Sequence, residues 1–385
     1  GSVQRSADRL RISARLIDAQ TDRHLWADSF DGAREDILDL QEQTVMGLIG
    51  GLGPDGRARP LQPTALPRSP VAYEAYLRAL YLLGKPASPR GLTEAVRELE
   101  RAIAEEDDAA VIHLALAEAF LAQAEGDLKP PKQAFAQLRL AAERGLELDP
   151  SSARARALLA MADTLHEWDF AAAARRFEEA IALDPEDILA RDGYSRLLTV
   201  TGRFEEALDQ QRILRELNPL IYHQPYLAYI YNMARQHDLA LQELQRQIAL
   251  EPRSPRLHAH LASTYRWLSR PAEAIGPLVR QLQLAGASPA SVAGIRAAFD
   301  RGQVAEVGRF LEDHYAGLEQ SGYRIAAISR AEASTLAGNL DAALRHIERA
   351  VEEREPRLLN LIHSPDYDVL RQDPGFQAVL RRING

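Results

Sequence analysis

The sequence predicts a mainly α-helical protein, in which about eight helix pairs stack into a right-handed superhelix behind a small α/β segment at the amino terminus. Three observations support this prediction. Amphipathic stretches of helical length end in a Leu-Asp-Pro, Leu-Asn-Pro or Leu-Glu-Pro sequence that recurs every 33–35 residues. An alanine precedes three of the four prolines by twelve residues. The amino-terminal segment instead alternates apolar and polar side chains, as a half-buried strand does.

The recurring marks have a structural meaning, since proline cannot continue a helix and small residues let two helices cross closely. The prolines are Pro150, Pro185, Pro219 and Pro252, and the alanines are Ala173, Ala207 and Ala240. Residues 202–207 predict a turn and a helix start, and residues 338–343 repeat this pattern. The marks resemble the tetratricopeptide repeat family, whose 34-residue unit folds as two antiparallel helices. The resemblance implies that successive pairs stack to bury their apolar faces.

The expected array covers residues 70–356, with an insertion at residues 85–89 in the first pair. The seventh pair has the least support, because Gly302 is the only repeat mark in it. The predicted pairs span residues 70–109, 110–150, 151–186, 187–219, 220–253, 254–287, 288–322 and 323–356. Their core is expected to include Phe177, Ala180, Tyr194, Leu198, Ala207, Leu227, Tyr231, Leu261 and Tyr265. Residues 357–385 are expected to form capping helices, because a repeat array needs a polar terminal cap.

The first 53 residues predict a different structure. Alternation predicts a hairpin of strands 9–18 and 23–30, a third short strand at 3–6 and an amphipathic helix at 35–49. Residues 54–69 are rich in proline and are expected to form an extended linker. Because few elements cover these strands, we expect their exposed edges to pair with a second copy of the chain, giving a homodimer, or to fold back on the repeats.

This amino-terminal segment resembles the end of a TolB-like domain. The similar residues are Gly1-Ser2-Val3, Leu16-Ile17-Asp18-Ala19, His24-Leu25-Trp26-Ala27 and Asp36-Ile37-Leu38-Asp39-Leu40-Gln41. In the family, this domain precedes tetratricopeptide repeats and follows a DNA-binding winged helix or an adenylate/guanylate cyclase domain. The segment 366–374 resembles the ending of the same proteins. The resemblance therefore implies a bacterial signalling or transcription-regulating protein whose effector domain is not in this chain.

Composition limits the classes of function. A net charge of −9 argues against nucleic-acid binding by this chain, because a nucleic-acid site needs a positive face to replace phosphate counterions. The absence of cysteine excludes disulfides and thiolate chemistry. No stretch is apolar for long enough to predict a membrane span. We expect the chain to be cytoplasmic, or periplasmic if a membrane helix precedes this region.

The sequence carries no pattern that predicts catalysis. Glycine-rich nucleotide loops are missing, and no serine, base and carboxylate occur at a readable spacing. His258 and His260 are two residues apart on a predicted helix, so their side chains diverge and do not predict a shared metal. We therefore expect no enzymatic activity, no cofactor and no metal in this chain.

The remaining place for a site is the concave face, which the first helix of each pair presents in the tetratricopeptide family. Counting from the repeat marks places a group of tyrosines and charged side chains on that face. The candidate residues are Asp192, Arg196, Tyr222, Tyr226, Tyr229, Asn232, Arg256, His260, Arg266 and Trp267. The tyrosines follow at i, i+4 and i+7 and so form one stripe, which could bind an extended peptide or pack between neighbouring pairs.

The predicted function is non-enzymatic binding of a protein or peptide, or sensing of a small effector, by the concave face. Two alternatives remain open at this level. The chain could be the non-catalytic part of an adenylate/guanylate cyclase, or it could be an oligomerisation scaffold. In many tetratricopeptide proteins a clamp of lysine, asparagine and arginine holds a peptide carboxylate, and only Asn232 and Arg266 match it here, in isolation.

Overall fold

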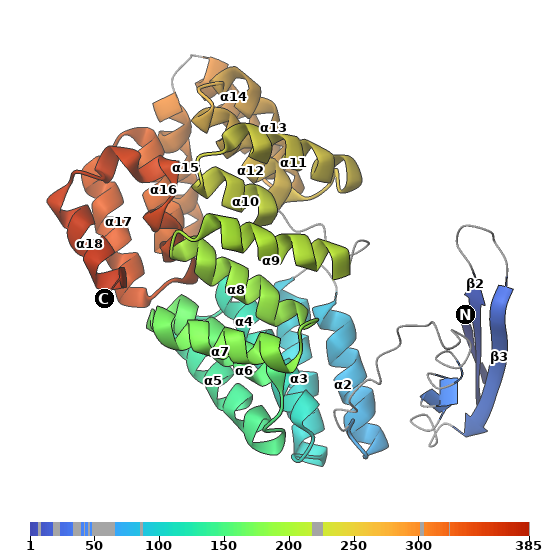
Figure 1. Ribbon diagram of the computed structural model, residues 1–385. Helices are drawn as coiled ribbons and strands as arrows, with labels where there is room; N and C mark the ends of the chain where they lie inside the picture. Colours follow the sequence, from blue (N-terminus) through green and yellow to red (C-terminus); the bar gives the residue numbers. More distant parts are fainter. Residues whose placement is uncertain are drawn as a thin grey trace. The chain divides into compact units, whose positions relative to one another are not determined.

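The computed structural model describes residues 1–6, 9–17, 24–33, 40–41, 43–44, 47, 66–84, 88–217, 226–300, 304–322 and 324–384 (Figure 1). The chain separates into two compact units, Gly1–Tyr73 and Glu74–Gly385. In the described residues, no helix is both long and apolar enough to cross a membrane.

The first unit contains the predicted sheet. Strands β1 (Ser2–Ser6), β2 (Arg9–Ile17) and β3 (His24–Ala33) form an antiparallel sheet in the order β1-β2-β3. Ile12 lies opposite Val3 on one side and Phe30 on the other, so the expected alternation and the third short strand are both present. Most of the predicted helix 35–49 and of the linker 54–69 lies outside the described residues.

The second unit is an array of paired helices. Its elements begin with α2 (Pro70–Leu83), which starts in the first unit, and continue with α3 (Pro89–Glu105), α4 (Ala110–Glu125), α5 (Pro131–Leu148), α6 (Ala153–Ala162), the π-helical turn η2 (Asp163–Glu167), α7 (Phe170–Leu183), α8 (Ile188–Val200), α9 (Phe204–Leu217), α10 (Tyr226–Met233), α11 (His237–Leu250), α12 (Pro255–Trp267), α13 (Pro271–Leu284), α14 (Pro289–Asp300), α15 (Val304–Gln320), α16 (Ala327–Ala337) and α17 (Leu340–Glu353). In the described part of the chain these helices follow one another as eight successive pairs in sequence, α2–α3 to α16–α17, and the two helices contact each other in the seven pairs from α4–α5 onwards. The predicted fold class is confirmed.

Local signals explain where the helices begin and end. Helices α5, α7 and α11 end two residues before Pro150, Pro185 and Pro252. The next helices start at N-cap side chains, for example Asp187 Oδ1, which accepts from the Ala190 amide at 2.7 Å. The crossing alanines predicted from the repeat marks are fully buried: Ala173, Ala207, Ala240 and Ala343. Seven of the nine expected core residues are buried, and Tyr231 and Tyr265 are partly buried against the cluster of α10–α12.

In the six pairs whose internal turn is described, that turn contains a residue in a left-handed conformation. Gly202 and Gly338 both have φ +77°, as the sequence marks suggested. The same position is held by non-glycine residues in other pairs: Asp127, Trp168, Arg235 and Ser269, with φ between +56° and +64°. The turn is therefore a property of the repeat, although glycine marks it in only part of the chain. Gly302 lies outside the described residues.

The carboxyl-terminal segment differs from a simple end cap. Two 3-10 helices, η3 (Pro356–Ile362) and η4 (Pro365–Leu370), precede helix α18 (Pro374–Asn384). Element η3 contacts α4, η2 and α8, which belong to the second, third and fourth pairs. Just before it, Arg354 Nη1 donates to the carbonyls of His166 and Glu167 at 2.7 and 2.9 Å. The end of the array thus returns to its earlier pairs across the concave side (Figure 1).

Candidate functional site

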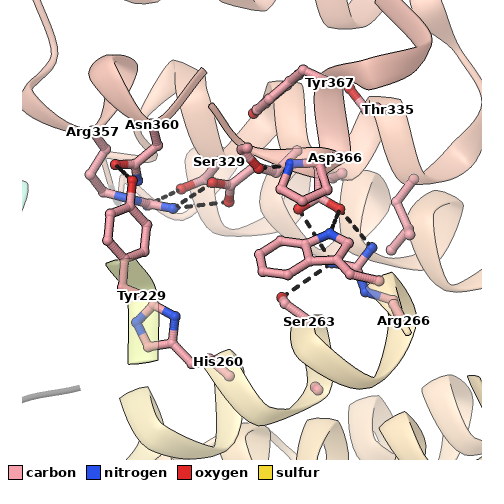
Figure 2. Close-up of a pocket in the computed structure, with 18 of the residues that line it drawn as sticks. Tyr229, His260, Ser263, Arg266, Ser329, Thr335, Arg357, Asn360, Asp366 and Tyr367 are labelled. Atoms are coloured by element: carbon pink, nitrogen blue, oxygen red, sulfur yellow. Dashed lines mark hydrogen bonds and ion pairs between the residues drawn. The ribbon is translucent and has the colours of Figure 1, made fainter. Parts of the chain in front are cut away.

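A cavity of about 870 Å³ lies between the first helices of the central pairs and the returning carboxyl-terminal segment (Figure 2). Helices α8, α10 and α12 form one wall, and α13–α15 add apolar side chains such as Leu278, Phe299 and Leu311. The facing wall comes from α16, η3 and η4, including Glu332, Asn360 and Asp366. The volume lies in the range of small-molecule and short-peptide sites.

Seven of the ten residues selected from the sequence line this cavity: Arg196, Tyr226, Tyr229, Arg256, His260, Arg266 and Trp267. Asp192 lies one turn before Arg196 and accepts from its Nε at 2.9 Å. Asn232 is fully buried beside the cavity wall, where its amide donates to Thr264 Oγ1 at 2.8 Å. Tyr222 lies outside the described residues.

The carboxyl-terminal segment is fixed to this wall by polar contacts. Arg266 Nη1 and the indole Nε1 of Trp267 both donate to Asp366 Oδ1, at 3.0 and 2.9 Å (Figure 2). The Tyr229 hydroxyl donates to Asn360 Oδ1 at 2.7 Å. These contacts bridge 99 to 131 residues of sequence. The sequence predicts only a cap for the tail, and no local periodicity marks Asn360 and Asp366, so neither is among the candidate site residues predicted from the sequence.

Other charged groups of the cavity are also paired. Arg357 Nη2 donates to both carboxylate oxygens of Glu332 at 2.9 Å, and Arg196 pairs with Glu125 as well as Asp192. The Arg196 guanidinium also lies 5.5 Å from the centre of the Tyr226 ring, within the range of a cation–π contact. Arg357 and its partner Glu332 hold the tail against α16, whereas Arg196 joins α8 to α4.

Aromatic rings form a continuous surface next to these charges. The rings of Tyr226 and Tyr229 are 5.2 Å apart, and the Tyr229 and His260 rings are 6.0 Å apart with a nearly edge-to-face angle of 66°. The two described tyrosines of the predicted stripe, Tyr226 and Tyr229, therefore pack against each other and also line the cavity. Burial raises the pKa of both tyrosine hydroxyls, so both are neutral at physiological pH.

His260 is also neutral. Burial, reinforced by the positive charges of Arg256 and Arg357, lowers the pKa of His260 to about 3. At physiological pH its ring therefore offers one N–H donor and one bare nitrogen acceptor.

This shift makes the stability of the array depend on pH. The unfolded chain protonates His260 near pH 6.5, whereas the folded chain does so near pH 3, so the unfolded state binds more protons between these values. The stabilisation is complete above about pH 6.5 and is lost as the pH falls towards 3. The unfolding free energy of the wild-type chain should fall between about pH 7 and pH 5. In His260→Asn this fall should be smaller by about 1–2 kcal/mol.

Urea unfolding of both proteins at the two pH values measures this difference. His24→Asn, at an exposed strand position in the first unit, is the control and should leave the pH dependence of wild type unchanged. An unaltered pH dependence in His260→Asn would contradict the assigned state of the imidazole. Burial also lowers the pKa of His166, His237, His346 and His363, so part of the pH dependence will remain in the variant.

Two serine hydroxyls of the cavity wall are held by arginines. The hydroxyl oxygens of Ser263 and Ser329 accept from Arg266 and Arg357, at 3.2 and 2.8 Å. A hydroxyl held in this way faces a cation and not a general base that could activate it. Within the described ranges, no three histidine or carboxylate side chains gather as metal ligands would.

Comparison with known proteins gives limited sequence similarity. No protein-family model matches the chain. Over 52 residues, which are 14% of this chain, it is 42% identical to a protein described as "Putative adenylate cyclase 3" of Rhizobium meliloti (strain 1021). The matched region amounts to 9% of the Rhizobium protein, so this chain corresponds to a small part of its length.

Solved structures with a similar arrangement include proteins described as tetratricopeptide repeat proteins. A tetratricopeptide repeat protein from Parabacteroides merdae covers 76% of this chain and 99% of its own, with 13% identity and a TM-score of 0.41. Yeast Tom70 covers 80% of this chain and 67% of its own, with 14% identity and a TM-score of 0.44. YrrB, described as a tetratricopeptide protein with an unusual peptide-binding site, covers 48% and 91%, with 17% identity and a TM-score of 0.32.

Proposed function

We propose that this chain is a non-enzymatic binding region of a bacterial signalling or regulatory protein, and that its concave face binds a protein or peptide partner. The observation that carries the proposal is the cavity, which is lined by seven of the ten side chains that the repeat spacing predicts for the concave face. Ring surfaces and arginines in one cavity supply contact area and orienting charge, the combination found at binding hot spots.

The regulatory part of the proposal has separate support. The 52-residue match to the Rhizobium protein favours a chain that accompanies a cyclase-type effector. In that case catalysis belongs to another domain, and this chain alone should produce no cyclic nucleotide from ATP or GTP. Measurable turnover by the purified chain would overturn the non-enzymatic assignment.

The binding part is tested by comparing captured proteins across variants. We expect wild-type protein immobilised on beads to retain a bacterial partner that the double variant Tyr226→Ser/His260→Gln does not retain. Tyr81→Ser is the control, since Tyr81 is an exposed tyrosine outside the cavity. Equal capture by all three proteins would place the partner elsewhere, and circular dichroism would confirm that the double variant is folded.

Pairing of two chains through the amino-terminal strands is proposed as a second contact. In the described part of the sheet, β1 and β3 are the two edges. Light scattering of the chain with and without residues 1–53 measures the effect, and a dimer that persists after the deletion would assign the contact to the repeats. A dimer lost with these residues would support the strand pairing.

A further inference from the structure

The carboxyl-terminal segment changes what the concave face can accept. Tyr229, Arg266 and Trp267 bind η3 and η4 directly, and His363 Nε2 lies 3.0 Å from the carbonyl oxygen of Val200 on α8. Leu361 and Tyr367 of the segment are buried, so it is part of the folded core. The segment therefore turns the central concave face into a partly open chamber of about 870 Å³, a volume that suits a small molecule better than a long stretch of polypeptide.

The charges of the chamber leave one cation without a partner. Four arginines line it, and three of them are paired: Arg196 with Glu125, Arg266 with Asp366 and Arg357 with Glu332. The fourth, Arg256, has no hydrogen bond or ion pair with any described residue. Its side chain is exposed, and the space it lines is the chamber. Although the residue keeps contact with solvent, desolvation by the surrounding protein and the charge of Arg196 lower the pKa of Arg256, and the carboxylates of Glu125 and Asp192 oppose this shift.

A second unsatisfied group lies one helical turn away. His260 follows Arg256 at i+4 on α12, so the two side chains share a face. Its neutral ring makes no hydrogen bond to a described residue, and it lines the chamber beside the Tyr229 ring (Figure 2). A ligand that reaches both residues gains a charge-assisted hydrogen bond from Arg256 and ring contact from His260 and the two tyrosines.

We propose that the chamber binds a small organic monocarboxylate with a planar or aromatic body, the carboxylate on Arg256 and the body against Tyr229 and His260. The inference goes beyond the proposed function, because it assigns a small effector, and not a protein or peptide, to the same cavity. A monoanion fits because the Arg256 guanidinium has no hydrogen-bond or ion-pair partner among the described residues, while the two nearby carboxylates, Glu125 and Asp192, both pair with Arg196. A phosphate dianion would bring a second charge close to the carboxylates of Glu125 and Asp192, which surround Arg196.

The test uses the full chain and two pairs of probes that differ only in charge. Benzoate and indole-3-acetate are compared with benzamide and indole-3-acetamide by titration calorimetry, with the fluorescence of Trp267 in the chamber wall as a second readout. We expect at least one acid to bind about tenfold more tightly than its amide, because the amide cannot form the ionic hydrogen bond. Equal affinity of acid and amide, or no binding of either acid, would overturn the inference.

Variants locate the anion. Arg256→Gln should weaken binding of the acid about tenfold and leave the amide unchanged, and Arg256→Lys should recover part of the loss because it keeps the charge but not the planar fork. Arg253→Gln, three residues away at an exposed site outside the chamber, is the matched control and should bind as wild type does. Full binding by Arg256→Gln would show that Arg256 is not the anchor.

A binding measurement with a peptide distinguishes this inference from the proposed function. Acetyl-Ala-Ala-Phe carries the same carboxylate and ring chemistry on a chain end. Binding of this peptide with no binding of either small acid would overturn the inference while supporting peptide recognition by the concave face. Binding of a small acid without any captured protein partner would support the inference and count against the protein-binding proposal.

Discussion

Gly308→Ala is expected to lower the free energy of unfolding of the repeat array by about 2–4 kcal/mol. Gly308 is buried at the point where α15 crosses the end of α16. A Cβ atom there would lie 2.2 Å from the backbone nitrogen of Ala337 and 2.6 Å from its Cα. Because these are backbone atoms, a rotamer change cannot relieve the clash, and the two helices must separate.

The same helix supplies the control. At Gly317 a Cβ atom would meet no atom within 4 Å, and the position is exposed. Gly317→Ala should therefore stabilise α15 by about 0.5–1 kcal/mol, since alanine has the higher helix propensity. Urea unfolding measures both effects, and amide hydrogen exchange should place the loss in Gly308→Ala at α15 and α16. A Gly308→Ala protein as stable as Gly317→Ala would mean that the helices do not cross here.

The helix pairs could be predicted from sequence because their determinants are local. Proline after a helix, a capping side chain before the next one and an alanine at the crossing all act within one repeat. A left-handed turn that contains no glycine could not be predicted from these local signals. Trp168 holds a left-handed conformation and its ring lies 4.4 Å below the guanidinium of Arg354, a contact that only the folded array brings together.

The candidate site was predictable on one wall only. Repeat spacing selected Tyr229 and Arg256, which line the cavity, but the facing wall includes a segment more than 100 residues further along the chain. Asn232 is a residue of the α8–α10–α12 wall that repeat spacing assigned to the concave face, although its side chain does not line the cavity. It lies three residues after Tyr229, about 60° away around the helix, and faces Thr264, whereas Met233 at i+4 lines the chamber.

Glu355 is a further residue that only the folded structure identifies as important. It is 1% exposed, and its two carboxylate oxygens accept hydrogen bonds from the backbone amides of Ala327 and Ile328 at 2.8 and 2.9 Å. The N-cap position of α16 is Ala326, which has no side-chain oxygen. Glu355, just beyond the end of α17, therefore caps α16 from a distance of 28 residues.

Glu355→Ala is expected to cost about 2–4 kcal/mol of unfolding free energy. The change leaves two buried amides at the start of α16 without acceptors and removes a negative charge from the positive end of the helix dipole. Glu355→Gln should cost less, because its single carbonyl oxygen still accepts from one amide. Glu352→Ala is the matched control, an exposed glutamate three residues earlier that should change stability by less than about 0.5 kcal/mol.

The location of the loss distinguishes capping from general destabilisation. Ala327 and Ile328 belong to the wall element that also carries Ser329 and Glu332, the partners of Arg357. Hydrogen exchange should therefore accelerate first in α16 and in η3, before the central pairs α6–α9 are affected, because each repeat contacts mainly its neighbours. Uniform acceleration across the array, or a Glu355→Ala protein as stable as the Glu352→Ala control, would contradict the capping role. A local loss would instead show that one carboxylate beyond the last repeat holds the far wall of the chamber in place.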